Sequence, residues 1–126
     1  TRRSSDLEYS DIEVNYPGLA GSKWHDIATE QFGDKFGGII TIRTGNKKRA
    51  FGIIDALKLP LIVSNIGDTK TLVIHPESTL NVHSTQEEKE TAGVFDDLIR
   101  ISVGIEDIED LIEDFKQAIE SVKEVY

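Results

Sequence analysis

Several residue types are missing or scarce in this 126-residue chain, which has no cysteine, no methionine, three prolines and one tryptophan. The absence of cysteine excludes disulfides, thiolate zinc sites and a cysteine nucleophile. No apolar run approaches the roughly 20 residues that cross a bilayer, and no secretory signal is present. We therefore expect a cytoplasmic protein of one domain. Because no methionine begins the chain, we expect either a processed protein or a piece of a longer one.

Charge is unevenly distributed along the chain, whose formal net charge is −9. Residues 1–50 carry 8 basic and 7 acidic side chains, whereas residues 51–126 carry 6 and 16. Binding to a nucleic-acid backbone requires a positive face. The acidic excess therefore argues against a nucleic-acid partner, and we expect no membrane partner either.

Hydrophobic periodicity divides the chain into short strands and helices. Residues 1–11 form a lead-in without a core pattern, and the folded domain is expected over 12–126. Strands are predicted at 12–16, 39–42, 61–63, 71–74 and 98–103, the third of them buried. Helices are predicted at 23–32, 47–58, 85–92 and 105–122. This alternation predicts an α+β fold of two layers, with one sheet and helices mainly on one face.

The first and last helices carry apolar residues at helical spacing. Ser22 is expected to cap the first helix, which would bury one face through Trp24, Ile27, Ala28 and Phe32. The last helix shows the clearest pattern, in its apolar residues Ile105, Ile108, Leu111, Ile112, Phe115, Ile119 and Val122. Its acidic side chains lie on the other face, where we expect them to be solvated.

The strand over 98–103 holds an arginine among apolar residues. Alternation places Leu98, Arg100 and Ser102 on one face and Ile99, Ile101 and Val103 on the other. The second set can pack beneath the helices, so Arg100 is expected on the opposite face. A guanidinium there loses hydration and keeps its charge, so it needs an anion. From the residues alone, an internal carboxylate and a ligand carboxylate or phosphate both remain possible.

Other candidate motifs have ordinary structural explanations. Residues 65–68 (Asn-Ile-Gly-Asp) form either a plain turn or a turn that lines a pocket with Asn65 and backbone N–H groups. The histidines His25, His75 and His83 are not spaced as metal ligands, so no metal site is expected. No set of serines, histidines and acids is placed for a catalytic triad.

Five motifs occur in an order and spacing that resemble one family. They are Asn15–Leu19, Phe36–Ile39, Ser64–Pro76, Ala92–Val94 and Leu98–Glu106. Together they resemble the C-terminal domain of the Cys/Met-metabolism enzymes that use pyridoxal phosphate, and most of all the O-acetylhomoserine sulfhydrylases, or homocysteine synthases. The resemblance extends over nearly all of the chain from about residue 12.

The resemblance implies a fold type I transferase, usually a homotetramer, whose cofactor lies between a large domain and this smaller one. Its reaction would replace the acyl group of an amino-acid substrate by sulfide, in methionine biosynthesis. The Schiff-base lysine belongs to the large domain, which this chain lacks. The chain alone is therefore expected to be inactive and not to bind pyridoxal phosphate.

In that family the arginine of the Arg-Ile/Leu-Ser-Val-Gly motif grips the substrate α-carboxylate, and Arg100 matches it. Asn65 matches a position near the cofactor-bearing lysine that is asparagine in sulfhydrylases and serine in γ-lyases. Ser64 replaces a glutamate common in γ-lyases, which favours transfer over elimination. The resemblance thus implies three substrate-binding residues and no catalytic residue in this chain.

One segment departs from the family pattern. Sulfhydrylases commonly have Ser-Thr-Thr-His after the His-Pro motif, whereas this chain has Asn81 at the histidine position and His83 two residues later. The wall of the substrate entrance therefore stays open to question. Two alternatives also remain: a non-enzymatic module that binds an amino acid or docks onto a partner, and, within the family, a cystathionine γ-synthase or γ-lyase.

Overall fold

The computed structural model describes residues 12–123, so the expected lead-in 1–11 lies outside the described residues, as do residues 124–126. The strands are β1 (Glu13–Asn15), β2 (Ile39–Arg43), β3 (Leu61–Ile62), β4 (Leu72–Ile74) and β5 (Leu98–Ser102). The helices are α2 (His25–Phe32), α3 (Lys47–Ala56), α4 (Gln86–Thr91) and α5 (Ile108–Lys123), with a 3-10 turn η1 (Pro76–Ser78). The predicted α+β fold is confirmed.

The strands form one mixed sheet in the order β1-β2-β5-β4-β3. β5 is its central strand and pairs antiparallel with both β2 and β4. β3 pairs with β4 in parallel and forms one edge, while β1 forms the other. The last strand in the chain therefore joins two pairs of strands that do not touch each other.

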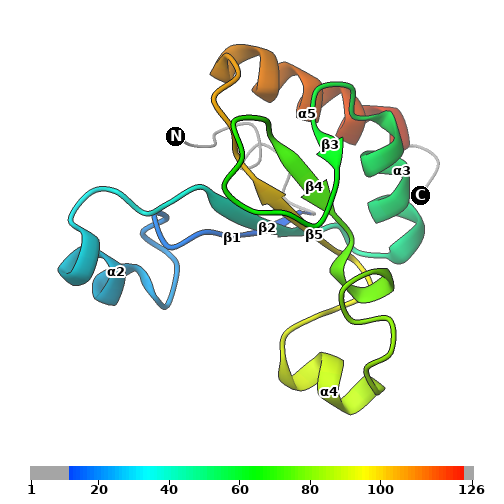
Figure 1. Ribbon diagram of the computed structural model, residues 1–126, viewed down its shortest axis with the longest axis horizontal. Coiled ribbons are helices and arrows are strands. Elements are labelled where there is room, and N and C mark those ends of the chain that lie inside the picture. The colour runs from blue at the N-terminus through cyan, green and yellow to red at the C-terminus, as the bar shows by residue number, and fades with distance from the viewer. Residues whose placement is uncertain (1–11, 124–126) are drawn as a thin grey trace.

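Helices α3 and α5 pack against each other over one face of the sheet (Figure 1). Alternation along β5 directs Ile99 and Ile101 into this layer, as expected. They join Ile42 and Val73 from neighbouring strands in a core that Phe115 and other residues of α5 close. Folding removes the apolar surface of these residues from water, and the hydrophobic effect is therefore the main source of stability in such a core.

Polar contacts fix the ends of α3. The Asn46 side chain caps the helix by accepting a hydrogen bond from the Arg49 N–H at 2.8 Å. After the helix ends, the Asp114 carboxylate of α5 accepts bonds from the backbone N–H groups of Lys58 and Leu59. These bonds supply hydrogen-bond donors to the Asp114 carboxylate, which is buried. They also tie the chain leaving α3 to α5.

The predicted burial of the first helix is wrong. It begins at His25, and Trp24 is the N-cap; the Ser22 hydroxyl accepts the Trp24 N–H but does not cap the helix itself. Ala28 is its buried residue, whereas Phe32 is 62% exposed. In Figure 1, α2 and α4 project from the sheet away from α3 and α5, so nothing in the described chain covers the apolar face of α2.

Two further burial predictions fail for a similar reason. The strand predicted as buried at 61–63 is the exposed edge strand β3, in which Ile62 is 61% exposed. Ile105, predicted as the first core residue of the last helix, is 82% exposed because that helix begins at Ile108. In both cases an apolar residue lies where the described chain provides no covering element.

Within residues 12–123, every helix is too short or too polar to span a bilayer. The cytoplasmic location expected from the composition stays a prediction.

Candidate functional site

The face of the sheet opposite α3 and α5 carries the arginine of β5. Register places Arg100 beside Thr41 of β2 and Ile74 of β4. Ser102 lies two residues further along β5, on the same face, and is buried. The sequence prediction that Arg100 faces away from the helical layer is therefore confirmed.

Arg100 has a backbone acceptor in place of an internal carboxylate. Its Nη2 donates a hydrogen bond to the carbonyl oxygen of Ser64 at 2.8 Å. Among residues 12–123, no aspartate or glutamate forms an ion pair with it. Of the two possibilities that the sequence left open, the internal salt bridge is not formed with any described residue. The guanidinium has five N–H donors in a planar fork, and most of them have no partner among residues 12–123.

A second arginine on the same face shows the opposite arrangement. Arg43 Nε lies 3.0 Å from Asp97 Oδ1, and its guanidinium lies 4.0 Å from the centre of the Phe95 ring. Asp97 is buried and also accepts the Gly45 N–H at 3.0 Å. Arg43 therefore already has its anion and its aromatic neighbour within the chain.

An open cleft of about 1390 Å³ lies over this face of the sheet. Its floor includes Thr41, Arg43 and Arg100, and its walls come from the chain before α2 and from the segment around α4. Trp24, the one tryptophan of the chain, lines the α2 side. A cleft of this size can hold a small molecule or accept part of another protein surface.

Ser64 and Asn65 lie at the edge of this arrangement and are not part of the cleft lining. Ser64 contributes its backbone carbonyl, which holds Arg100. The Asn65 side chain is exposed, and it makes no hydrogen bond with any residue in 12–123. The turn that follows has Gly67 at a φ of 76°, a left-handed conformation that favours glycine. The structure joins Ser64 to Arg100 through this backbone bond, which the sequence did not predict.

The turn bearing these residues is linked to the end of β5. The Gly67 N–H donates to the Ser102 hydroxyl at 3.1 Å. The Glu106 carboxylate accepts the Thr71 N–H at 2.8 Å and the Thr71 hydroxyl at 2.8 Å. Burial acts to raise the pKa of Glu106, but these hydrogen bonds and one from its own N–H outweigh it, so the net pKa lies below its ordinary value.

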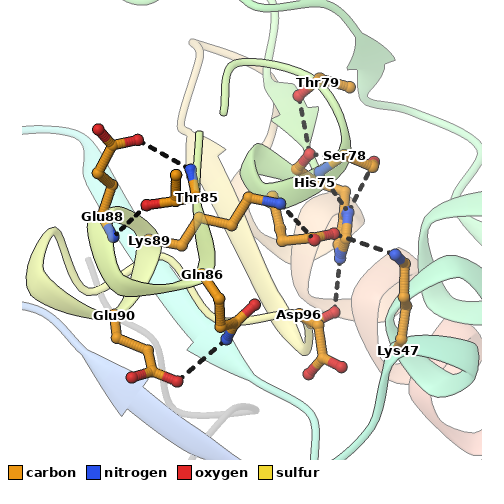
Figure 2. Close-up of polar contacts among 11 residues, drawn as sticks. Lys47, His75, Ser78, Thr79, Thr85, Gln86, Glu88, Lys89, Glu90 and Asp96 are labelled. Carbon is orange, nitrogen blue, oxygen red and sulfur yellow. Dashed lines mark hydrogen bonds and ion pairs between the residues drawn. The ribbon is translucent and has the colours of Figure 1, made fainter. Parts of the chain in front are cut away.

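His75 and His25 make local structural contacts. His75 is buried, and its Nε2 lies 2.6 Å from the Asp96 carbonyl oxygen while its Nδ1 lies 2.8 Å from the Ser78 hydroxyl (Figure 2). His25 Nδ1 contacts the Pro17 carbonyl oxygen. No cluster of metal-ligating side chains occurs in the described part of the chain. At the segment that departs from the family pattern, Asn81 lines the cleft and His83 does not.

Charge holds the α4 side of the cleft. Glu77 of η1 accepts hydrogen bonds from Lys89 of α4 at 2.8 Å and Lys47 of α3 at 3.0 Å (Figure 2). The hydrogen bond from Lys89 has the largest effect and that from Lys47 the next largest, and together they lower the pKa of Glu77 from 4.5 to about 2. α4 itself begins with a capping box between Thr85 and Glu88 and has no buried residue. Its position therefore depends on ion pairs more than on apolar burial.

Several site residues escaped the sequence analysis. Thr41 and Asn15 line the cleft because register aligns them with Arg100 across the sheet. The strand order that produces this alignment cannot be obtained from periodicity. Ser102 did carry a signal, because it shares the Arg100 face and is the polar residue two positions away.

A mixed sheet with helices on one face, and on the other a cleft whose floor holds an arginine with no carboxylate partner among residues 12–123, defines an α+β domain with a candidate binding site. Comparison with known proteins gives its family. The chain belongs to the Cys/Met-metabolism PLP-dependent enzyme family, whose model matches residues 8–120. Pyridoxal phosphate (PLP) is the cofactor of that family.

Relatives with different activities resemble the chain about equally. Homocysteine synthase of Schizosaccharomyces pombe is 42% identical over 85% of this chain and 25% of its own length. L-methionine gamma-lyase of Fusobacterium nucleatum subsp. polymorphum is 40% identical over 86% of this chain and 28% of its own. O-acetyl-L-homoserine sulfhydrylase 1 of Thermus thermophilus is 42% identical over 84% and 25%. The chain thus spans about a quarter of the length of these curated relatives.

A solved structure shows the same fold. The crystal structure of a putative O-acetylhomoserine (thiol)-lyase from Campylobacter jejuni has a TM-score of 0.87 and 38% identity, covering 92% of this chain and 28% of that chain. That structure contains a pyridoxyl-lysine monophosphate. The fold type I class predicted from the sequence is confirmed.

The described residues do not themselves fit an attachment site for the cofactor. Lys23 is the lysine of the cleft lining, and its Nζ lies 4.9 Å from the centre of the Trp24 ring on an exposed segment. An amine that forms a Schiff base is typically activated by desolvation or by a cationic neighbour. Lys23 is exposed, so its amine is not desolvated and does not fit that role.

Proposed function

We propose that the chain, over residues 12–126, is the C-terminal, substrate-carboxylate-binding domain of a PLP-dependent O-acetylhomoserine sulfhydrylase. Arg100 would grip the α-carboxylate of the amino-acid substrate, with Asn65 and Ser64 beside it. The larger part of the enzyme would supply the cofactor, its lysine and the remaining catalytic groups. On its own the chain would be inactive.

The observation that carries the proposal is the state of Arg100. A partly buried guanidinium with one backbone acceptor and no described carboxylate partner lies on the floor of an open cleft. A carboxylate matches the planar guanidinium fork by accepting two parallel hydrogen bonds. The bond from Nη2 to Ser64 limits rotation of the fork, which lowers the entropy lost on binding.

The residues of this chain would bind and orient, and the cofactor would supply the electron sink for the chemistry at the substrate. Arg100 would fix one end of the substrate. Thr41 and Asn15 would line the surface beside that end. Precise positioning of this kind can lower a barrier substantially, because the reacting groups are then already oriented.

The choice of sulfhydrylase over γ-lyase depends on Asn65 and Ser64. The first matches the sulfhydrylase pattern, and the second lacks the carboxylate common in γ-lyases. The similarity to both kinds of relative supports the family more strongly than this choice. We propose the γ-replacement reaction on these two residues.

We further propose that the partner of this chain is the larger, cofactor-binding part of the enzyme, in a homotetramer. The relatives are about four times as long as the matched segment. Apolar side chains of α2 and β3 are exposed, notably Phe32 and Ile62. Large exposed apolar patches commonly mark such interfaces.

The test begins with the native reading frame and the intact mass of its product. A product of only these 126 residues, with no companion chain that carries the large domain, would contradict the proposal and favour a non-enzymatic module. If a large domain is present, Arg100→Ala should lower kcat/KM for O-acetylhomoserine roughly 30- to 1000-fold. This corresponds to a loss of about 2–4 kcal/mol of transition-state stabilisation. Arg100→Lys should recover only part of this loss, because a single ammonium replaces a planar fork.

Lys48→Ala is the matched control, because Lys48 is an exposed basic residue at the start of α3 on the other face. Its kcat/KM should equal that of the wild type. An Arg100→Ala enzyme with an unchanged specificity constant would overturn the role of Arg100. Purified 126-residue chain mixed with PLP should show no Schiff-base absorbance and no sulfide-dependent turnover.

A further inference from the structure

The turn that holds Arg100 belongs to a loop, residues 64–71, that runs along the end of β5 and the segment after it, residues 100–106. Several hydrogen bonds join the two segments. Arg100 Nη2 donates to the Ser64 carbonyl at 2.8 Å, and the Gly67 N–H donates to the Ser102 hydroxyl at 3.1 Å. We call the interface between residues 64–71 and residues 100–106 the 64–71 seam.

Further along the seam, the Ile105 N–H donates to the Thr69 carbonyl oxygen at 2.9 Å. The Gly104 N–H donates to the Thr71 hydroxyl at 2.9 Å. That hydroxyl in turn donates to the Glu106 carboxylate, which also accepts the Thr71 N–H. The seam thus combines one bond between backbone groups with bonds that involve four side chains, those of Arg100, Ser102, Thr71 and Glu106.

Close packing supports the seam at Gly104. A Cβ atom at this position would overlap the backbone of Thr69 and Lys70, so the two segments approach more closely than any other residue would allow. Such an approach leaves little room for the loop to shift without breaking bonds. The loop is exposed to solvent over residues 64–70, so burial does not fix its position.

We propose that Ser102 and Glu106 are positioning residues, which hold the 64–71 loop against β5 and thereby fix the Ser64 carbonyl that orients the Arg100 guanidinium. The proposal rests on the proposed function, since the oriented guanidinium is the group that would meet the substrate carboxylate. Ser102 acts closest to Arg100, because it bonds to Gly67 three residues after Ser64. Glu106 acts at the far end of the loop.

The alternative is that these bonds merely stabilise the fold. Ser102 is 3% exposed and is not one of the cleft-lining residues, and its hydroxyl accepts a bond from the loop. A purely structural role would change stability and leave the Arg100 side chain as it is. A positioning role must also change the order of that guanidinium.

The experiment uses ¹⁵N-labelled 126-residue chain and follows three quantities by NMR: exchange of the Gly67 amide proton, order of the Arg100 Nε–H, and affinity for L-methionine. L-methioninamide, which lacks the carboxylate, is the ligand control. In Ser102→Ala we expect faster Gly67 exchange, a loss of order at Arg100 and about fivefold weaker binding of L-methionine, as one lost hydrogen bond predicts. Glu106→Gln should change the same quantities in the same direction by less.

Two further variants separate positioning from local stability. Ser102→Thr restores a hydroxyl and should return Arg100 to its wild-type order. Asp68→Asn is the matched control, because Asp68 bonds only within the loop, to Thr69 and Lys70, among the described residues. It should leave Arg100 unchanged.

An Arg100 Nε–H that keeps its order in Ser102→Ala would overturn the proposal, whether or not Gly67 exchange increases. If the seam variants disorder Arg100 but the wild-type chain does not distinguish L-methionine from its amide, the positioning role stands and the carboxylate role of the proposed function fails. If Arg100→Ala abolishes L-methionine binding but Ser102→Ala changes nothing, the carboxylate role of Arg100 stands and the positioning role of Ser102 fails.

Discussion

On one face of the sheet, Ile42, Val73 and Ile99 lie beneath α3 and α5 and are removed from water. On the other face, Thr41 and Arg100 line an open cleft between the segment before α2 and the segment around α4. The same strands supply both faces by alternation. The helix-covered face contributes apolar burial, while the open face carries polar groups whose contacts are only partly satisfied within the described chain.

The difference shows how a small domain can carry an arginine outside its core with no carboxylate partner among the described residues. A charge placed in the covered layer would need an internal partner. On the open face Arg100 needs only one backbone acceptor and can keep other donors for a ligand. Arg43, on the same face, shows that an arginine there can also be fully engaged within the chain.

The largest expected effect separates the two faces within one strand. Ile99→Ala removes a fully buried side chain and should lower the free energy of unfolding by about 3–4 kcal/mol, through lost burial and a cavity. Leu98→Ala, its neighbour on the open face, should cost about 1 kcal/mol or less. Urea unfolding of the two variants measures both. Equal losses would show that the cleft face is also part of the core.

A smaller effect separates the two arginines of the open face. Asp97→Ala should cost about 2–3 kcal/mol, because it removes the partner of Arg43 and leaves the Gly45 N–H without its acceptor. Arg100→Ala should cost at most about 1 kcal/mol, since no carboxylate loses a partner. The same urea measurements apply. A loss at Arg100 as large as that at Asp97 would mean that Arg100 is engaged in structure rather than kept for a ligand.

The smallest expected effect concerns pH and the charged attachment of α4. The pKa of Glu77 is about 2 in the folded chain against an ordinary value of 4.5. Because this pKa is lowered, its ion pairs stabilise the fold above about 4.5, and that contribution is lost as pH falls from 4.5 towards 2. The loss should be about 1–2 kcal/mol, since Lys47 is exposed and solvent weakens its pair.

Comparing unfolding at several pH values in wild type and Glu77→Gln isolates this contribution. The variant should be less stable near neutral pH and should lose less on acidification. Glu106, whose pKa is also lowered, would contribute equally to both proteins and cancel in the comparison. Parallel acid profiles would show that burial, rather than charge, holds the α4 side of the cleft.

The sequence predicted the elements well because short-range patterns determine them. The alternation of β5 correctly placed Ile99 in the core and Arg100 on the opposite face. Periodicity in the last helix identified Leu111, Phe115 and Ile119 as buried. These features depend on 2.0- and 3.6-residue repeats, which a sequence shows directly.

Periodicity failed where it had to say which surface would be covered. Phe32, Ile62 and Ile105 follow apolar patterns but lie exposed in the described chain. An apolar pattern shows that a face favours burial; it does not show which element covers it. The acceptor of Arg100 was unpredictable for a related reason, because only the strand order brings Ser64 beside it.

The central place of β5 has a consequence for how the molecule is made on the ribosome. Until residues 98–102 emerge, β1 and β2 can pair only with each other, and so can β3 and β4. β5 then pairs with both β2 and β4 and joins the two halves of the sheet. Its pairing with β2 spans a long stretch of chain, and contacts between residues far apart in sequence form slowly. Arg100 therefore comes to lie between Thr41 and Ile74 only in the step that completes the sheet, and the carboxylate site proposed for it would form at the same moment.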